Sequence, residues 1–205
     1  MKTTLLSAEA KNTISHAVDV LQQGGVVAFP TDTVYGLGAL AFDEDSIRRL
    51  YRIKGREHTK AIAVLISEAD ALNQIAEAPS EAAMRLARRF WPGPLTLVLP
   101  RNQRVPEALA AGESIGVRVP DHPFALALLK AAGPMGVTSA NRSGEANAST
   151  AVEVLAQLEG RAHLVVDGGT APRGVPSTVV DMMGEMPKVL REGPISEAEL
   201  LATLA

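Results

Sequence analysis

Residues 26–38 read Val-Val-Ala-Phe-Pro-Thr-Asp-Thr-Val-Tyr-Gly-Leu-Gly, which places a short apolar run directly before a polar segment. The run from Val26 to Phe29 contains no polar side chain and stops at Pro30. A continuous apolar run of this length, ended by proline, is typical of a strand that is buried on both faces. Such strands occur mainly in α/β folds, so this stretch predicts the fold class.

The segment after this strand carries hydroxyl groups at the strand's carboxyl end. Thr31 and Thr33 follow the proline, and Gly36 and Gly38 come next. Loops at the carboxyl ends of strands bind ligands in α/β folds, and glycines allow close approach of the backbone. The segment therefore predicts either a binding loop for a small polar molecule or a plain turn capped by Asp32. Its spacing matches neither phosphate-binding glycine fingerprint.

Outward from this strand, apolar runs alternate with amphipathic helical patterns. Further strands are predicted at residues 62–66, 95–99, 115–119, 136–138, 164–166, 177–181 and 188–190. Helices are predicted at residues 7–23, 80–90, 124–132 and 151–158, with two more beginning near residues 43 and 196. Helices between strands favour parallel pairing, whereas the late strands follow one another directly. We therefore expect an α/β fold with a mixed sheet, in one domain over residues 1–205 and without a further C-terminal domain.

Polar residues before these helical patterns predict the helix starts. Ser7 and Thr150 precede apolar periodic stretches and are expected to cap them. The pair Ser67–Asp70 has the spacing of a capping box, and Ser196–Glu199 matches the box fully.

Composition excludes several classes of protein. The hydrophobic and charged fractions, 46% and 21%, are ordinary for a globular protein, and cysteine is absent. We therefore expect a cytoplasmic protein without disulfides or thiolate metal sites, and its first residues lack the apolar core of a signal peptide. No apolar run approaches the roughly 20 residues that span a bilayer. Aromatic residues make up 3% and the pI is near 5.8, which argues against base-stacking platforms and a generally basic surface.

Residues 48–60 carry a local excess of positive charge in a chain whose net charge is −3. The cations are Arg48, Arg49, Arg52, Lys54, Arg56 and Lys60, against the single acid Glu57. Cations near a helix C-terminus are favoured by its dipole. Lys54, Arg56 and Lys60 around one glycine also make a suitable clamp for a triphosphate. The pattern alone leaves both interpretations open.

Arg118 lies inside the apolar run Ile115–Val119. A charge in a buried strand is costly unless it is paired. Arg118 is therefore expected to pair with an internal acid, to point into a pocket at a carboxylate, or to face solvent from an edge strand.

Polar groups also stand at the ends of later predicted strands. Thr138, Ser139 and Asn141 follow one strand, Ser177 opens another, and Arg191 closes a third. Ser and Asn suit the phosphate or sugar of a nucleotide, although a turn that binds its own backbone explains them as well. A serine hydrolase would need a distant histidine. The histidines at 16, 58, 122 and 163 have no metal-ligand spacing, so no metal site is expected.

Taken in order, these segments resemble the Sua5/YciO/YrdC family. The matching blocks are residues 30–38, 54–60, Trp91–Thr96, Val117–Pro120, Thr138–Asn141, Val175–Thr178 and Leu190–Pro194. The resemblance implies a twisted mixed sheet surrounded by helices, with an open, positively lined cavity. It also implies a nucleotidyltransferase that joins L-threonine, bicarbonate and ATP into threonylcarbamoyl-adenylate and releases diphosphate, for the t6A modification of tRNA.

The resemblance further implies roles for single residues. ATP with Mg²⁺ would be a substrate complex, with no tightly bound cofactor. Matching positions assign ATP binding to Lys54, Arg56, Lys60, Ser139, Asn141 and Arg191, with Lys54 and Arg56 as the catalytic cations. Matching positions assign threonine binding to Thr31, Thr33, Arg118, Thr138 and Ser177. The implied partners are proteins of the t6A transfer machinery and tRNA itself, with no membrane contact.

The chain departs from some relatives at Leu65, where they carry histidine. Any lid over the cavity is expected from loops 142–149 or 167–176, or from a partner. An alternative function is a module of the same fold that binds double-stranded RNA, tRNA or ribosomal RNA, without synthase activity; its binding would weaken steeply with salt. A hydrogenase-maturation type of carbamoyl-adenylate domain is less consistent with the sequence, because cysteine is absent.

Overall fold

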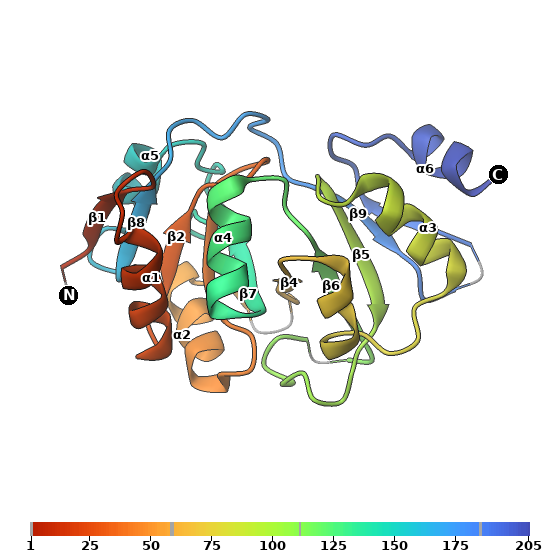
Figure 1. The fold of residues 1–205 in the computed structure, drawn as a ribbon, viewed down its shortest axis with the longest axis horizontal. Coiled ribbons are helices and arrows are strands. Elements are labelled where there is room, and N and C mark those ends of the chain that lie inside the picture. Colours follow the sequence, from red (N-terminus) through yellow and green to blue (C-terminus); the bar gives the residue numbers. More distant parts are fainter. Residues whose placement is uncertain (1, 58–59, 111, 185) are drawn as a thin grey trace.

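The computed structural model describes residues 2–57, 60–110, 112–184 and 186–205, so His58 lies outside the described residues. One sheet of ten strands runs through this part of the chain in the order β1-β8-β2-β3-β7-β4-β6-β5-β9-β10 (Figure 1). The strands are β1 (Thr4–Ser7), β2 (Val27–Phe29), β3 (Gly36–Leu40), β4 (Ala63–Leu65), β5 (Leu95–Pro100), β6 (Ser114–Arg118), β7 (Met135–Ser139), β8 (Leu164–Asp167), β9 (Thr178–Asp181) and β10 (Lys188–Arg191). Parallel pairs such as β4 with β6 and antiparallel pairs such as β3 with β7 share the sheet. The predicted mixed α/β fold is confirmed.

The helices flank this sheet, and several begin where the sequence predicts. They are α1 (Thr13–Gln22), α2 (Glu44–Lys54), the 3-10 helix η1 (Ala69–Gln74), α3 (Glu81–Phe90), α4 (Pro123–Ala132), α5 (Ala151–Leu158) and α6 (Glu197–Leu204). Side chains of Asp43, Ser80, Thr150 and Ser196 accept hydrogen bonds from the first turns of α2, α3, α5 and α6. Within the described residues, no helix has the length and apolar character needed to cross a membrane.

The prediction for Ser7 was wrong. Ser7 is the last residue of β1, which pairs in parallel with β8, and α1 begins only at Thr13. The Ser7 hydroxyl accepts from the backbone N–H of Glu9 at 3.2 Å, so it stabilises a turn between strand and helix. Pairing with a strand about 160 residues away decides this segment, and no local pattern reports such a partner.

The capping box predicted at Ser67–Asp70 was also wrong. The residue before the first turn of η1 is Glu68, and its side chain makes no capping hydrogen bond. Asp70 lies inside that first turn, so the spacing of the two polar side chains does not match the start of the helix.

The register of the strands divides the side chains between two faces, because residues paired across strands lie on the same face. Face A carries Gly36 and Val137, which oppose Ser139 and Gly38 respectively, and also Leu65 opposite Arg118. Face B carries the neighbouring residues of each strand, such as Val64 opposite Val117.

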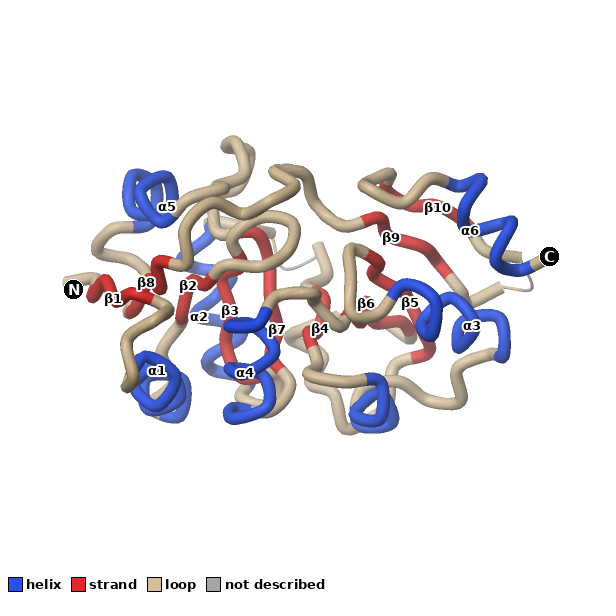
Figure 2. The backbone as a smooth tube through the Cα atoms, turned by 45° about the horizontal axis from the view of Figure 1, so that its top comes forward, coloured by secondary structure: helices blue, strands red, loops and turns tan. Residues whose placement is uncertain are grey.

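Face B is covered along the sheet, whereas face A is covered only in part. Ile47 of α2, Leu86 of α3 and Val154 of α5 belong to the core on face B. On face A, α1 and α4 pack over β2 and β8 through residues such as Leu21 and Leu128. Figure 2 shows α1 and α4 on the opposite side of β2 and β8 from α5. The sheet twists strongly, as right-handed strands do, so that α4 on face A and α3 on face B both lie toward the viewer in Figure 1.

Strand β3 lies in the centre of the sheet, whereas the sequence predicts that Gly36 and Gly38 belong to a loop. Gly36 and Gly38 lie in it, on face A. A Cβ atom at Gly36 would lie 2.8 Å from a methyl group of Val137, and one at Gly38 would lie 2.8 Å from the end of Met135. The close approach that glycine permits is therefore between this strand and the side chains of its neighbours. The sequence does not predict this strand, because it is rich in glycine and glycine is disfavoured in strands.

Candidate active site

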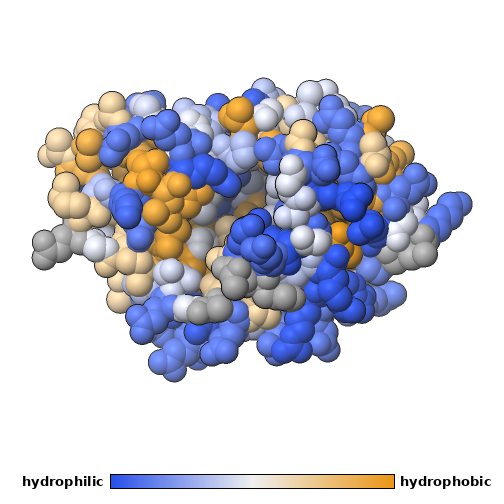
Figure 3. Space-filling view, turned by 180° about the vertical axis from the view of Figure 1, so that it is seen from behind, coloured by the Kyte–Doolittle hydropathy of each residue, from blue (hydrophilic) through white to orange (hydrophobic). Residues whose placement is uncertain are grey.

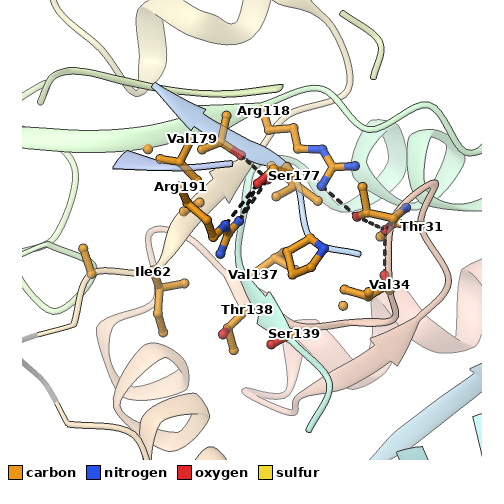
Figure 4. Close-up of a pocket in the computed structure, with 18 of the residues that line it drawn as sticks. Thr31, Val34, Ile62, Arg118, Val137, Thr138, Ser139, Ser177, Val179 and Arg191 are labelled. Carbon is orange, nitrogen blue, oxygen red and sulfur yellow. Dashed lines mark hydrogen bonds between the residues drawn. The ribbon is translucent and has the colours of Figure 1, made fainter. Parts of the chain in front are cut away.

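The part of face A that α1 and α4 leave uncovered forms the floor of a cavity of about 350 Å³. The lining residues on this floor recur at every second position of their strands, as the register requires. They are Gly36, Ala63, Leu65, Thr96, Val98, Gly116, Arg118, Val137, Ser139, Val179 and Arg191. In Figure 3 the molecule is hollowed near the middle, between an apolar and a strongly hydrophilic surface. In Figure 4, Thr138 and Ser139 lie across the cavity from Ser177 and Arg191.

The lining of the cavity is positively charged. Arg56, Arg118 and Arg191 contribute guanidinium groups, and the described lining contains no aspartate or glutamate. Burial lowers the pKa of Arg191, and Coulombic repulsion from Arg56 acts in the same direction. Like charges held together in this way favour an anionic ligand.

Arg118 is paired with an internal acid and also lines the cavity, so two of the interpretations left open by the sequence hold together. Its Nη2 donates to Asp32 Oδ1, and both side chains are buried. Its Nε donates to the carbonyl of Gly93 at 2.9 Å and its Nη1 to the hydroxyl of Thr33 at 3.0 Å. Of its five N–H groups, two remain without a partner among the described residues. A carboxylate needs two such donors for bidentate binding.

Asp32 is a residue of the site whose role the sequence reading missed. The sequence suggests Asp32 only as the cap of a plain turn, which is one of two interpretations of this loop, but its side chain pairs with Arg118. Burial lowers the pKa of the Arg118 guanidinium, and attraction by Asp32 opposes that shift. The second oxygen of Asp32, Oδ2, is buried without a hydrogen-bond partner in the described part of the chain. A buried arginine must be paired with an acid. This requirement could have identified Asp32, because it is the acid inside the predicted binding loop.

Two threonine hydroxyls extend this network along the loop before β3. Thr31 donates its hydroxyl proton to the carbonyl of Val34 at 2.7 Å, so the 3.0 Å contact between the two hydroxyls must use the proton of Thr33. Thr33 also accepts from Arg118. Both residues are buried and line the cavity. These contacts fix the orientation of both hydroxyl groups. Among the described residues, Thr33 keeps one acceptor position for a ligand's N–H or O–H.

Arg191 and Ser177 lie together on the facing side of the cavity (Figure 4). Nε and Nη2 of Arg191 donate to the carbonyl of Ser177 at 3.1 and 2.9 Å, and Nη2 also reaches its hydroxyl. The Ser177 hydroxyl lies 2.8 Å from that of Thr96, a lining residue that sequence reasoning missed. Thr96 shares face A with Arg118 through the register of β5 and β6, which the sequence pattern alone does not report. Both N–H groups of Arg191 Nη1 remain for a ligand.

Lys54 does not line the cavity but holds its wall from behind. Its ammonium contacts the carbonyl and hydroxyl of Ser139 and the carbonyl and side-chain oxygen of Asn141. Burial lowers the pKa of Lys54 from 10.5 to about 8, and repulsion from Arg56 adds to the shift. Asn141 is likewise buried and absent from the lining, whereas Ser139 and Thr138 line it. Lys54 therefore acts on the cavity through Ser139.

Arg56 stands on a less buried part of the wall, and Lys60 lies nearby outside the cavity. Arg56 lines the cavity and donates to the carbonyls of Lys60 and Ala61, at 3.0 Å each. The ammonium of Lys60 is exposed and lies 3.3 Å from Glu57, and Lys60 does not line the cavity. Of the predicted phosphate clamp, the structure thus places Arg56 at the cavity, Lys54 behind it and Lys60 outside it.

Both loops expected to form a lid reach the cavity. Asn147 of the first loop and Pro176, the last residue of the second, are lining residues. The second loop is tied to the segment before β3. Tyr35 donates its hydroxyl proton to the carbonyl of Gly169 at 2.7 Å, and the backbone N–H of Gly174 donates to the carbonyl of Thr33 at 3.0 Å. Within the described residues, no group of three or more His, Cys, Asp or Glu side chains is placed to hold a metal ion.

Comparisons with known proteins agree on one family. The model of Sua5_yciO_yrdC, described as telomere recombination, matches residues 19–193. The threonylcarbamoyl-AMP synthase of Bacillus subtilis (strain 168) is 40% identical over 194 residues, which are 93% of this chain and 56% of that protein. The chain thus spans about half the length of this curated relative.

Solved structures share the fold over nearly the whole chain. The crystal structure of P. abyssi Sua5 complexed with L-threonine matches with a TM-score of 0.94 and 36% identity, over 100% of this chain and 61% of that one. The crystal structure of E. coli YciO matches with a TM-score of 0.85 and 30% identity, over 97% of this chain and 98% of that one.

Proposed function

The chain belongs to the Sua5/YciO/YrdC family, and from this membership and the geometry of the cavity we propose that it is a threonylcarbamoyl-AMP synthase. It would join L-threonine, bicarbonate and ATP, and release diphosphate. The main observation behind this proposal is the geometry of Arg118, which is buried beside Thr33 and has two N–H groups without a partner among the described residues. In addition, the structure of this chain matches that of P. abyssi Sua5 complexed with L-threonine with a TM-score of 0.94.

In this proposal the end of the cavity at Arg118 binds threonine. The two remaining N–H groups of Arg118 suit the α-carboxylate, since guanidinium and carboxylate form paired hydrogen bonds. Thr31, Thr33, Thr138 and Ser177 supply hydroxyls for the polar groups of the substrate. Leu65, where some relatives carry histidine, gives an apolar contact for the substrate's methyl group.

The nucleotide would occupy the side of the cavity formed by Arg56, Ser139 and Arg191. Arg56 and Arg191 each keep N–H groups free for phosphate oxygens. Lys54 fixes the backbone at Ser139 and Asn141, and its charge lies directly behind this wall. We assign Lys60 a weaker role, because its ammonium already pairs with Glu57.

The chemistry requires charge neutralisation and positioning. The amine of threonine captures carbon from bicarbonate with loss of water, giving a carbamate. A carbamate oxygen then attacks the α-phosphorus of ATP; the new C–O–P link forms as the bond from the α-phosphorus to the bridging oxygen breaks, and diphosphate leaves. Both reactants are anions, so the guanidinium groups bring them together and stabilise the leaving diphosphate. No side chain acts as a nucleophile in this scheme.

We propose that Mg²⁺ enters with ATP. The described lining offers guanidinium and hydroxyl groups but no carboxylate, so the phosphates would be the main ligands of the ion. The t6A transfer machinery would then take the threonylcarbamoyl group for tRNA in the cytoplasm. These partners follow from the proposed activity.

Diphosphate release by the purified chain with Mg²⁺ and ATP tests this function. We expect release only when L-threonine and bicarbonate are both present. Arg118→Lys, which keeps the charge but loses the fork of donors, is the matched variant and should require far more threonine. Release that is indifferent to threonine, or absent altogether, would contradict the proposal; absence together with tight binding of double-stranded RNA would favour the RNA-binding alternative.

A further inference from the structure

A second cleft, of about 440 Å³, lies between α2 and the connection from α5 to β8. It is lined by Arg49, Arg52, Ile53, Gly160, Arg161 and His163. None of these residues lines the cavity described above. The described lining of this cleft contains three arginines and a histidine but no acid.

Two of its guanidinium groups have no internal partner. Arg52 and Arg161 are exposed, and within the described part of the chain neither side chain makes a hydrogen bond or an ion pair. Arg48, on the same helix, is different: it contacts Glu44 at 2.8 Å and Asp45 at 3.5 Å. The positive charge of α2 is therefore neutralised near its start and left uncompensated at the cleft.

The other two polar groups of the cleft are held in place. Arg49 donates to the carbonyl of Gly24 at 2.6 Å, and its attraction contributes to the lowered pKa of Asp43. His163 Nδ1 accepts from the backbone N–H of Val26 at 3.0 Å, so the neutral ring carries its proton on Nε2. Burial lowers the pKa of His163, and Arg49 acts in the same direction. His163 therefore offers one N–H donor.

The helix dipole accounts for part of this arrangement. Arg52 lies in the last turn of α2, and Arg161 follows the end of α5, where the helix dipole favours a cation. That effect acts on each residue separately. It does not explain why the two side chains and Arg49 share one cleft without an acid, where they repel one another in a chain of net charge −3.

We propose that this cleft is a second anion site that takes a phosphate group between Arg52 and Arg161, with His163 Nε2 as a further donor. A single arginine often binds a phosphate group through two parallel N–H···O hydrogen bonds. The phosphate comes either from the backbone of a double-stranded RNA or from a free phosphate ion. The site does not depend on the activity proposed for the cavity, although α2 contributes to both: it carries Arg52 in the cleft and Lys54 behind the cavity wall.

Charge reversal tests the backbone source. The double variant Arg52→Glu, Arg161→Glu should bind a short double-stranded RNA at least about tenfold more weakly than the unmodified chain. The slope of log Kd against log salt should fall by up to about 2, one for each lost phosphate contact. The double variant Arg104→Glu, Lys130→Glu is the matched control, because both side chains are also exposed and without a partner in the described residues, and it should change neither quantity. The far-ultraviolet circular dichroism of both variants should match that of the unmodified chain, which shows that they fold.

Titration with inorganic phosphate tests the other source. The NMR signals of the His163 ring should shift on addition of phosphate in the unmodified chain but not in the double variant. If this shift occurs while RNA binding is unaffected by the charge reversals, the site stands and its ligand is free phosphate. If the double variant binds RNA as the unmodified chain does and phosphate leaves the His163 signals unchanged, the proposal is overturned.

Discussion

At one end of the cavity the side chains of Arg118 and Asp32 are 7% and 5% exposed, whereas the Lys60 and Glu57 side chains beside Arg56 are 56% and 71% exposed. Thr31 and Ile62 mark these two sides in Figure 4. Removing one partner of a buried ion pair leaves the other charge buried and unpaired, which strongly destabilises the fold. An exposed ion pair contributes only about 0–1 kcal/mol to stability. The buried end therefore combines stability with a fixed binding geometry, and the exposed end can adapt to a flexible polyphosphate at little cost to stability.

The largest effect is expected when the buried pair is broken. Arg118→Ala should lower the free energy of unfolding by about 3–5 kcal/mol, because Asp32 would remain buried and charged. Chemical denaturation measures this loss. Lys60→Ala, the control at the exposed end, should change stability by less than about 1 kcal/mol, because its pair with Glu57 is exposed. Equal losses in the two variants would show that the two ends do not differ.

A change at Arg118 that keeps its charge separates binding from folding. Arg118→Lys should weaken threonine binding by about 1.5–3 kcal/mol, the range for hydrogen bonds to charged groups, because lysine lacks the fork of donors. The ATP requirement should change much less. Calorimetric titration with each substrate distinguishes these outcomes, and an equal loss for both would reassign Arg118 to folding or to phosphate binding.

The exposed end should show the opposite selectivity. Arg56→Ala should weaken ATP binding by about 1.5–3 kcal/mol and leave threonine affinity nearly unchanged, since only the phosphates carry enough charge to need it. Binding of ATP by the variant measures the effect. Unchanged ATP affinity would remove Arg56 from the nucleotide site.

A pH dependence is expected from Lys54, which lies behind the cavity wall and contacts Ser139. Its pKa is about 8 in the folded chain and 10.5 ordinarily. Above pH 8 the amine loses its charge, so ATP affinity should fall with pH, by at most about tenfold per unit. Between pH 8 and 10.5 the unfolded chain binds more protons than the folded one, so this group's contribution to stability rises with pH instead. Measured between pH 7 and 10, the ATP affinity should therefore fall while the contribution of Lys54 to the free energy of unfolding rises.

Lys54→Arg is the control for this pH dependence, because arginine keeps its charge throughout the range. Its ATP affinity should not show the decline above pH 8. A decline of equal size in the variant would assign the titration to another group.

The smallest effect is expected at Lys60. The ammonium of Lys60 is exposed, and among the described residues it is paired only with Glu57. Lys60→Ala should therefore change ATP affinity and stability by less than about 1 kcal/mol each. A loss as large as that of Arg56→Ala would show that Lys60 turns toward the phosphates when ATP binds.

Much of the fold was accessible from local patterns. Continuous apolar runs identified β2, β4 and β8, and capping residues such as Thr150 and Ser196 identified helix starts. The failures share one cause. The segment at Ser7 and strand β3 owe their structure to neighbours distant in sequence, and glycine or serine composition carries no sign of that pairing.

Sequence alone determined which groups the cavity contains, namely hydroxyls and guanidinium groups at strand ends, because these polar residues interrupt apolar runs. Only the tertiary structure decided how they are used. Strand register brought Arg118 to the same face as Thr96 and Arg191, burial paired it with Asp32, and packing placed Lys54 behind the wall and Lys60 outside it. The physical reason is that pairing and burial depend on which segments meet in space, whereas residue type depends only on the chain.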